Sequence, residues 1–421
     1  MELKKFLKSG HFPTLLSSLF YFDISFMVWV LLGPLAPFIA VQLKLSATQK
    51  GLLTAIPLLG GSLFRPILGI LADRIGGRRT GLLGMILTLV PLVIGWRFAH
   101  ELWQYYALGL LLGIAGASFA VALPLASRWY PPEQQGLVLG LAGAGNSGTL
   151  LATLFAPRIA QHLGVQATFA IAMIPVLAIL LFFAVFAKDS QRTAPPAWGV
   201  YGALLREADT YWLSFFYCLT FGGFVGLISY LTIFFADQYH LSKVQAGDFT
   251  TLVVIAGSFL RPVGGWFSDK IGGYKFLLIV LFSAGLCFAF TATIPAIATT
   301  TCLLFAGMGI LGMGNGAVFQ LVPLRFQSRV GIATGIVGAA GGLGGFFLPS
   351  GFGVLKEHTG HYSAGFVALA FCFFFASLVL LLLSRRWLSK WEPEAARCAG
   401  ILNLRIPGTV QTEYETIPYV E

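Results

Sequence analysis

Long uninterrupted apolar runs limit how this chain can fold more than any other feature does. One helix that crosses a bilayer needs about 20 mostly apolar residues, and the 421-residue sequence contains twelve such runs. They lie near residues 14–42, 51–73, 79–98, 103–127, 136–163, 167–187, 210–236, 246–268, 274–296, 300–325, 331–354 and 362–386. Because the runs are continuously apolar and do not alternate, they predict spanning helices and not a β-barrel.

The composition agrees with a protein that is dissolved mainly in lipid. Hydrophobic residues make up 57% of the chain and charged residues 10%, whereas soluble domains carry roughly 25% charged residues. The first run follows "MELKKFLKSG" and continues to about Leu43 without a small-residue cleavage site, so it predicts an uncleaved span and not a signal peptide. We therefore expect an all-α, multi-pass protein of the plasma (inner) membrane.

Basic residues are distributed unevenly over the predicted bundle. With twelve spans, both chain ends and the even-numbered loops share one side, and nineteen basic residues fall there. They are Lys4, Lys5, Lys8, Arg74, Arg78, Arg79, Arg128, Lys188, Arg192, Arg206, Lys270, Lys275, Arg325, Arg329, Arg385, Arg386, Lys390, Arg397 and Arg405. The other side has Lys44, Lys50, Arg97, Arg158, Lys243 and Lys356. The positive-inside rule then predicts cytoplasmic termini, and the formal net charge of +10 needs no nucleic-acid partner.

The two halves of the sequence repeat one pattern. A shift of 196 residues aligns "SLFRPILGILADRIGGRR", residues 62–79, with "SFLRPVGGWFSDKIGGYK", residues 258–275. Six spans in each half give a parallel repeat, which is the architecture of major facilitator transporters. The predicted parts are an N-terminal half (1–187), a cytoplasmic linker (188–209), a C-terminal half (210–386) and a cytoplasmic tail (387–421).

The repeated loops carry a candidate gate. "GILADRIGGRR" and "GWFSDKIGGYK" resemble the G-x-x-x-D-[RK]-x-G signature of that superfamily, with a second glycine inserted before the basic residues. Asp73 and Arg74 stand in the first loop, and Asp269 and Lys270 in the second. At cytoplasmic helix ends these charges can pair when an inner gate is shut.

Arg65 and Arg261 are the two basic residues outside the loops and tails. Arg65 precedes Asp73 by eight residues, or roughly 12 Å of helix, which is near the middle of a hydrocarbon core of about 30 Å. A central arginine costs at least about 2.5–3.5 kcal/mol. Among the acids only Asp23 lies in a predicted span, and it cannot neutralise both arginines. The pair therefore predicts a site between the halves for a small planar oxyanion, with Asp23 as the candidate proton-binding residue.

Further polar and aromatic residues lie in the spans around these arginines. Asn146 either joins helices or contacts a substrate, and the same two interpretations hold for Asn315. Phe119 and Phe319 precede a proline at corresponding places of the two halves. The cysteine spacing indicates no metal site, so we expect no cofactor.

Several motifs resemble the nitrate/nitrite porters of the major facilitator superfamily. They are "FRP" and "LRP" in the second and eighth spans, the doubled D-[RK]-I-G-G loop, "AGAGNSG" in the fifth span and "GAAGGLGGFFLP" in the eleventh. The resemblance implies that Arg65 and Arg261 clamp nitrate or nitrite and that Phe119 and Phe319 sandwich its flat face. It further implies that Asn146 and Tyr217 contribute hydrogen bonds to the substrate.

The resulting functional hypothesis is a monomeric transporter of nitrate, nitrite or both that works by alternating access. The sequence leaves open proton symport or nitrate/nitrite exchange, and an assimilatory or a respiratory role. Transport of another small anion, such as a carboxylate, is the nearest alternative, and a non-transporting anion sensor is a remote one. We expect no enzyme, since no nucleophile elbow, phosphate loop or zinc motif occurs.

Overall fold

The computed structural model describes residues 9–190, 197–326 and 329–401, and these are helical almost throughout. The helices are α2 (Phe12–Trp29), α3 (Leu32–Leu43), α4 (Ala47–Ile75), α5 (Gly77–Arg97), α6 (Leu102–Gly116), α7 (Phe119–Ser127), α8 (Pro132–Gly143), the 3₁₀ helix η1 (Ala144–Ser147), α9 (Gly148–Leu163), α10 (Val165–Phe186), α11 (Trp198–Leu205), α12 (Ala208–Tyr239), α13 (Lys243–Phe259), α14 (Arg261–Ile271), α15 (Gly273–Thr291), α16 (Ile297–Phe326), α17 (Val330–Thr359), α18 (Ser363–Lys390) and α19 (Pro393–Cys398). Within the described residues, 12 segments are long and apolar enough to cross a membrane, so the predicted all-helical, twelve-span fold is confirmed.

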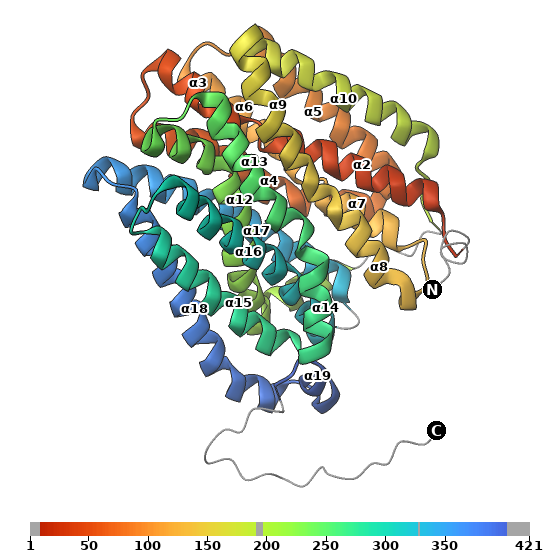
Figure 1. Cartoon of the computed structure of the whole chain (residues 1–421). Helices are drawn as coiled ribbons and strands as arrows, with labels where there is room; N and C mark the ends of the chain where they lie inside the picture. The colour runs from red at the N-terminus through yellow and green to blue at the C-terminus, as the bar shows by residue number, and fades with distance from the viewer. Residues whose placement is uncertain (1–8, 191–196, 327–328, 402–421) are drawn as a thin grey trace.

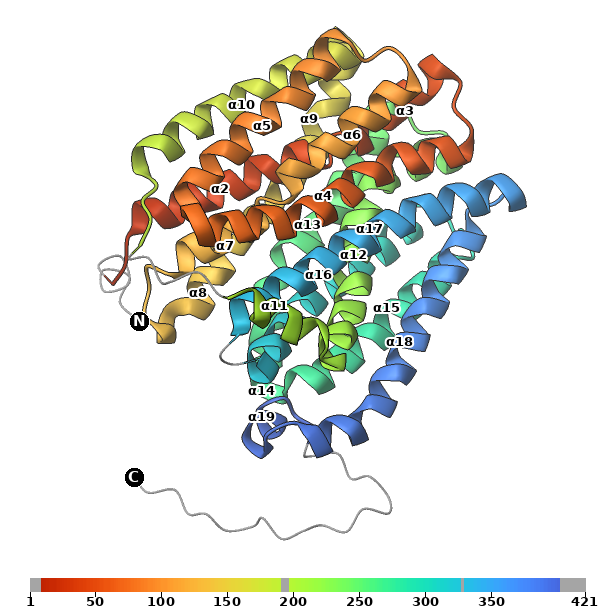
Figure 2. The same cartoon turned by 180° about the vertical axis from the view of Figure 1, so that it is seen from behind.

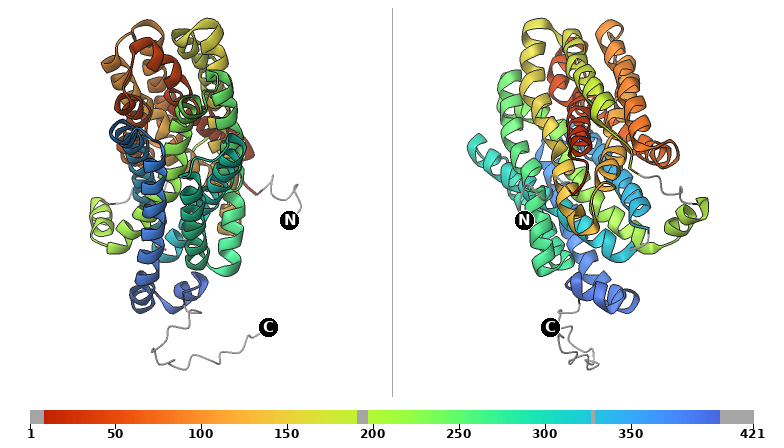
Figure 3. Two further views of the ribbon diagram at one scale, coloured as in Figure 1. Left: turned by 60° about the vertical axis from the view of Figure 1, so that its left-hand side comes forward. Right: turned by 90° about the vertical axis from the view of Figure 1, so that its right-hand side faces the viewer.

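The two six-span halves lie against each other (Figures 1 and 2). The N-terminal half is coloured red to yellow, and the C-terminal half green to blue. The main contacts between them join α4 to α17, α9 to α13 and α3 to α12. Figure 3 shows from two sides that the spanning helices run alongside one another in both halves.

Four spans are interrupted, and the interruptions lie close to the predicted site. Span 1 breaks between α2 and α3, span 4 between α6 and α7, span 8 between α13 and α14, and span 5 contains η1. In span 8 the break at Leu260 precedes Arg261 and Pro262, and proline lacks the N–H that would continue the helix. Pro66 follows Arg65 in the same way, but α4 stays continuous there. The two copies of the repeat therefore present their arginines differently.

The expected linker and tail contain helices. Residues 188–209 include α11, and α12 begins at Ala208. At the other boundary α18 continues to Lys390, and α19 follows within residues 387–421. The boundaries expected at 209/210 and 386/387 thus both fall inside helices.

Ion pairs join the two halves at the end of the bundle remote from α19, here called the opposite end. Lys50 Nζ lies 2.6 Å from an Asp237 oxygen, and Arg158 Nη1 lies 2.7 Å from an Asp248 oxygen. A carboxylate oxygen of Glu357, on α17, accepts hydrogen bonds from the Ser46 hydroxyl at 2.8 Å and the Thr48 amide at 2.7 Å. An acidic group at the N-terminus of α4 is favoured by the helix dipole.

The ion pairs found among the described residues at the end that contains α19 each stay within one half. Arg128 Nη2 lies 2.7 Å from Asp73 Oδ1, both in the N-terminal half. Asp269 is exposed and forms no ion pair with the described residues, and Lys270 Nζ lies 3.8 Å from the Trp266 ring centroid. Asp73 thus pairs within its own half in this conformation, and Asp269 forms no ion pair across the bundle with the described residues.

Closure of the opposite end depends on small residues at the α4–α17 contact. A Cβ atom on Gly51 would lie 2.4 Å from the Pro349 carbonyl oxygen, and one on Gly353 would lie 2.6 Å from the Ala47 carbonyl oxygen. Side chains larger than hydrogen at these places would keep the two helices apart.

Gly353→Ala is therefore expected to separate the halves at the opposite end, because the atom that its methyl group meets belongs to the backbone. Gly351→Ala, on the same helix, is the matched control, since no described atom lies within 4 Å of its Cβ position. Double electron–electron resonance between spin labels at Gln42 and His358, both exposed, measures the separation. Longer distances for Gly353→Ala alone are expected, and equal distributions for both variants would contradict the tight contact.

Candidate functional site

The Arg65 side chain is 1% exposed and lies between the two halves. Its Nε donates to the Gly116 carbonyl oxygen at 3.1 Å, and its Nη1 donates to the carbonyl oxygen of Gly338 on α17, in the other half. Its Nη2 is buried and has no hydrogen-bond partner among the described residues. Two carbonyls thus hold the guanidinium in place, and one donor group is left over.

The Gly116 carbonyl can accept this bond because of the break in span 4. Gly116 is the last residue of α6, and the last carbonyls of a helix lack intrahelical donors. The negative end of the helix dipole also favours a cation there. The acids of the sequence can be counted as partners for Arg65, but nothing in the sequence indicates these two carbonyls.

Aromatic rings surround the Arg65 guanidinium. Its Cζ lies 5.1 Å from the ring centroid of Trp29, 5.0 Å from that of Phe221 and 5.5 Å from that of Phe119. Cation–π contacts of this kind stabilise a desolvated cation by about 2 kcal/mol or more. Trp29 and Phe221 were not expected from the sequence, because one tryptophan or phenylalanine carries no signal in a chain with 38 phenylalanines.

Arg261 faces the same aromatic group from the C-terminal half. Its Cζ lies 5.5 Å from the Phe319 centroid and 5.7 Å from the Phe119 centroid. Its Nη1 is buried without a hydrogen-bond partner in the part of the chain that the structure describes. Phe119 is thus shared by both guanidinium groups, and each arginine keeps a donor that no described residue uses.

The expected sandwich of Phe119 and Phe319 is closed in this conformation. The ring centroids lie 5.9 Å apart with an interplanar angle of 54°, whereas a flat ion in contact with both faces needs roughly 7 Å. Tyr217 meets Phe319 edge to face at 4.9 Å and stacks on Phe221 at 5.0 Å. The structure therefore brings Phe119, Phe319 and Tyr217 together beside the arginines.

Buried polar atoms without partners accompany these rings. The Tyr217 hydroxyl lies within electrostatic range of both arginines, yet it makes no hydrogen bond of good geometry with a described residue. Both amide atoms of Asn146, in η1, and both of Asn315, in α16, are also buried and unpaired among the described residues. Neither amide oxygen accepts a hydrogen bond from the arginines here.

Asp23 bonds to a neighbouring helix and not to the arginines. Its Oδ1 accepts a hydrogen bond from the Ser147 hydroxyl at 2.7 Å, and the ion pairs found in the described residues do not include it. This agrees with the expectation that Asp23 does not neutralise Arg65 and Arg261.

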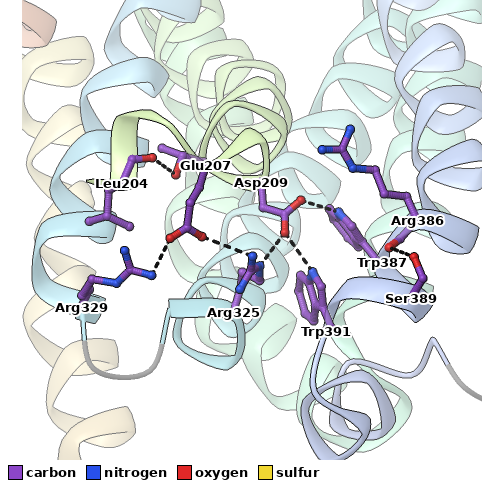
Figure 4. A network of polar contacts seen from close by, with 10 residues as sticks. Leu204, Glu207, Asp209, Arg325, Arg329, Arg386, Trp387, Ser389 and Trp391 are labelled. Atoms are coloured by element: carbon purple, nitrogen blue, oxygen red, sulfur yellow. Dashed lines mark hydrogen bonds and ion pairs between the residues drawn. The ribbon is translucent and has the colours of Figure 1, made fainter. Parts of the chain in front are cut away.

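A second polar cluster lies at the end of the bundle that contains α19 and was not expected from the sequence (Figure 4). Asp209, which is 2% exposed, accepts from Arg325 Nε at 2.5 Å and from the indole N–H groups of Trp387 at 3.1 Å and Trp391 at 3.2 Å. The Glu207 carboxylate forms two ion pairs, with its oxygens 3.2 Å from Arg325 Nη2 and 2.5 Å from Arg329 Nη2. The cluster ties the start of α12 to the ends of α16 and α18.

A cavity of about 270 Å³ borders this cluster. It is lined by Leu324, Arg325, Phe326, Arg329, Lys390, Trp391, Glu392 and Ala395. Arg325 and Arg329 are already neutralised by Glu207 and Asp209, so the cavity offers an anion less charge than the central arginines do. No group of three or more metal-binding side chains occurs in the described ranges.

The chain matches the family model of the Major Facilitator Superfamily over residues 19–349. The chain is a member of that superfamily. It is 37% identical to the "Nitrite extrusion protein" of Bacillus subtilis (strain 168) over 82% of this chain and 87% of the relative. It is 35% identical to the "Probable nitrate/nitrite transporter NarK2" of Mycobacterium tuberculosis, over 82% of this chain and 90% of the relative. It is 34% identical to the "Probable nitrate transporter NarT" of Staphylococcus carnosus, over 82% of this chain and 89% of the relative. The assignment to the nitrate/nitrite porters from motifs is thus confirmed, and none of these relatives is named as an enzyme.

Two solved structures of superfamily members have the same fold. The human organic anion transporter MFSD10 matches with a TM-score of 0.69 and 14% identity over 88% of this chain and 99% of its own. A bacterial homologue of the human lysosomal transporter Spinster matches with a TM-score of 0.69 and 19% identity over 90% and 98%. At such identities the likeness concerns the major facilitator fold alone.

Asp209→Asn is expected to destabilise this superfamily member, because Arg325 then keeps a positive charge with one carboxylate removed. Breaking a buried ion pair costs about 3–5 kcal/mol, so the melting temperature of the detergent-solubilised protein should fall. Asp269→Asn is the control, since Asp269 is exposed and unpaired within the described residues. Equal melting temperatures for the two variants would mean that the cluster is not structural.

Proposed function

We propose that this protein transports nitrate, nitrite or both across the plasma (inner) membrane by alternating access, with both termini in the cytoplasm. The observation that carries the proposal is the pair of arginines between the halves, each with a donor that no described residue uses. The printed names of three relatives, which refer to nitrate or nitrite, support this substrate class.

The anion is held by in-plane hydrogen bonds from both arginines. Arg65 Nη2 and Arg261 Nη1 are the available donors, and a guanidinium presents its donors in one plane, as a planar oxyanion presents its acceptors. The Tyr217 hydroxyl completes the site, and Asn146 and Asn315 contribute when the helices move. Phe119 and Phe319 separate to admit the ion between their faces.

Movement of the halves follows from electrostatics. Two guanidinium groups that share Phe119 repel each other in a medium of low dielectric constant, and one bound anion removes most of that repulsion. Without an anion, this repulsion opposes the occluded state, in which both halves close around the site. With an anion bound, the protein can pass through that state. Lys50–Asp237 and Arg158–Asp248 hold the external side shut in this conformation, while Asp73, Arg74, Asp269 and Lys270 act at the cytoplasmic side.

Arg65→Lys and Arg261→Lys are each expected to reduce nitrate uptake into proteoliposomes at least tenfold. Lysine keeps the charge but loses the fork, and one charge-assisted hydrogen bond contributes about 1.5–3 kcal/mol. Arg97→Lys, at an exposed position over the Trp96 ring, is the control and should transport normally. Full uptake with either central lysine would contradict the two-arginine site.

Competition separates the proposed substrate from the nearest alternative. If nitrate and nitrite suppress uptake of labelled nitrate while formate at the same concentration does not, the anion is not a carboxylate. Stronger suppression by formate would favour a carboxylate transporter, and anion binding without uptake would favour a sensor.

Exchange is the expected mode of coupling, because the empty protein resists closure. Proteoliposomes loaded with nitrite should take up nitrate without a pH gradient, and a pH gradient alone should drive little uptake. Asp23→Asn should retain exchange, since Asp23 bonds to Ser147 and does not contact the arginines in the described structure. Uptake driven by a pH gradient and lost in Asp23→Asn would instead establish proton symport.

A further inference from the structure

Trp29 is fully buried at the end of α2, where span 1 breaks. Its indole Nε1 donates to the Pro57 carbonyl oxygen at 2.7 Å, which fixes the ring relative to α4. Two turns further along α4, the Arg65 guanidinium lies 5.1 Å from the centroid of the same ring. Trp29 thus contacts both the backbone and the functional side chain of one helix.

Two glycines make room for this indole. A Cβ atom on Gly61 would lie 2.6 Å from the ring, and one on Gly116 would lie 2.3 Å from it. Gly116 is also the residue whose carbonyl accepts the Arg65 Nε–H. The indole therefore packs against Arg65 and against one of its two hydrogen-bond acceptors.

The internal repeat reproduces the contact between ring and glycine but not the contact between ring and arginine. A Cβ atom on Gly257, 196 residues after Gly61, would lie 2.3 Å from the Phe224 ring, but the cation–π contacts of Arg261 among the described residues are with Phe119 and Phe319. The shift of 196 residues that aligns Arg65 with Arg261 places Val225 at the position of Trp29 and Ser25 at that of Phe221. Trp29 and Phe221 are stacked, with centroids 6.5 Å apart and an interplanar angle of 18°, and both lie against Arg65. The extra aromatic support belongs to one arginine only.

We propose that Trp29 is a positioning residue that holds the Arg65 side chain in its binding orientation and limits the size of the anion beside it. The inference rests on the proposed role of Arg65 in anion binding. A long side chain loses rotamer entropy when it is fixed, and fixing it before binding strengthens affinity. The rings of Trp29, Phe119 and Phe221 contact the Arg65 guanidinium, so an ion that enters once Phe119 and Phe319 separate is admitted more readily if it is flat than if it is tetrahedral.

Trp29→Leu tests both parts of the proposal in proteoliposomes. The KM for nitrate should rise roughly fivefold or more, since fivefold is already the effect of a weak cation–π contact, while Vmax stays within about twofold. Inhibition of nitrate uptake by perchlorate, a tetrahedral anion, should strengthen. Trp29→Phe keeps a ring face and should restore most of the nitrate affinity. Trp103→Leu, at an exposed tryptophan, is the matched control.

A lower Vmax with an unchanged KM, or equal defects in Trp29→Leu and Trp29→Phe, would overturn the inference and leave Trp29 with a packing role. If Trp29→Leu is not monodisperse in detergent, Trp29→Met replaces it, because a methionine fills more of the space of the indole and also lacks a ring face. Trp29→Met is then compared with Trp29→Phe in the same assay. If the wild-type protein takes up nitrate and every Trp29 variant behaves as the wild type does, the inference about Trp29 is contradicted but the proposed function is not. Wild-type protein that takes up no nitrate would contradict the proposed function as well.

Discussion

Two guanidinium groups held between the halves of a membrane protein are the constraint on which the rest of the structure depends. Neither Arg65 nor Arg261 forms an ion pair with a described acid. Carbonyl oxygens and aromatic faces offset the desolvation of Arg65, and two phenylalanine rings line Arg261. One donor on each arginine is left without a partner in the described chain, so the pair carries uncompensated positive charge, as the proposed anion site requires.

The helix breaks serve this constraint. The end of α6 at Gly116 frees a carbonyl for Arg65, and the break at Leu260 puts Arg261 at the start of α14. The end of α2 places Trp29 against Arg65. A repeat that looks symmetrical in sequence therefore builds an asymmetrical site, with one arginine held on several sides and the other more accessible.

Much of this fold could be predicted from the sequence, because bilayer thickness sets the length of apolar runs and the repeat sets their pairing. The central arginines could be found by elimination, since acids are few. The Gly116 and Gly338 carbonyls could not, because they lie 51 and 273 residues from Arg65 and every residue carries a carbonyl. The cluster around Asp209 was missed for a similar reason, since its indole donors come from a segment assigned to the tail.

The location of a bound anion tests the central claim most directly. A cryo-electron microscopy or crystal structure with nitrate would show whether the ion lies between Arg65 and Arg261. We predict one ion within hydrogen-bond distance of Arg65 Nη2 and Arg261 Nη1, with the Phe119 and Phe319 rings moved apart. Nitrate bound instead in the cavity beside Arg325 and Arg329, with the central arginines unoccupied, would contradict it.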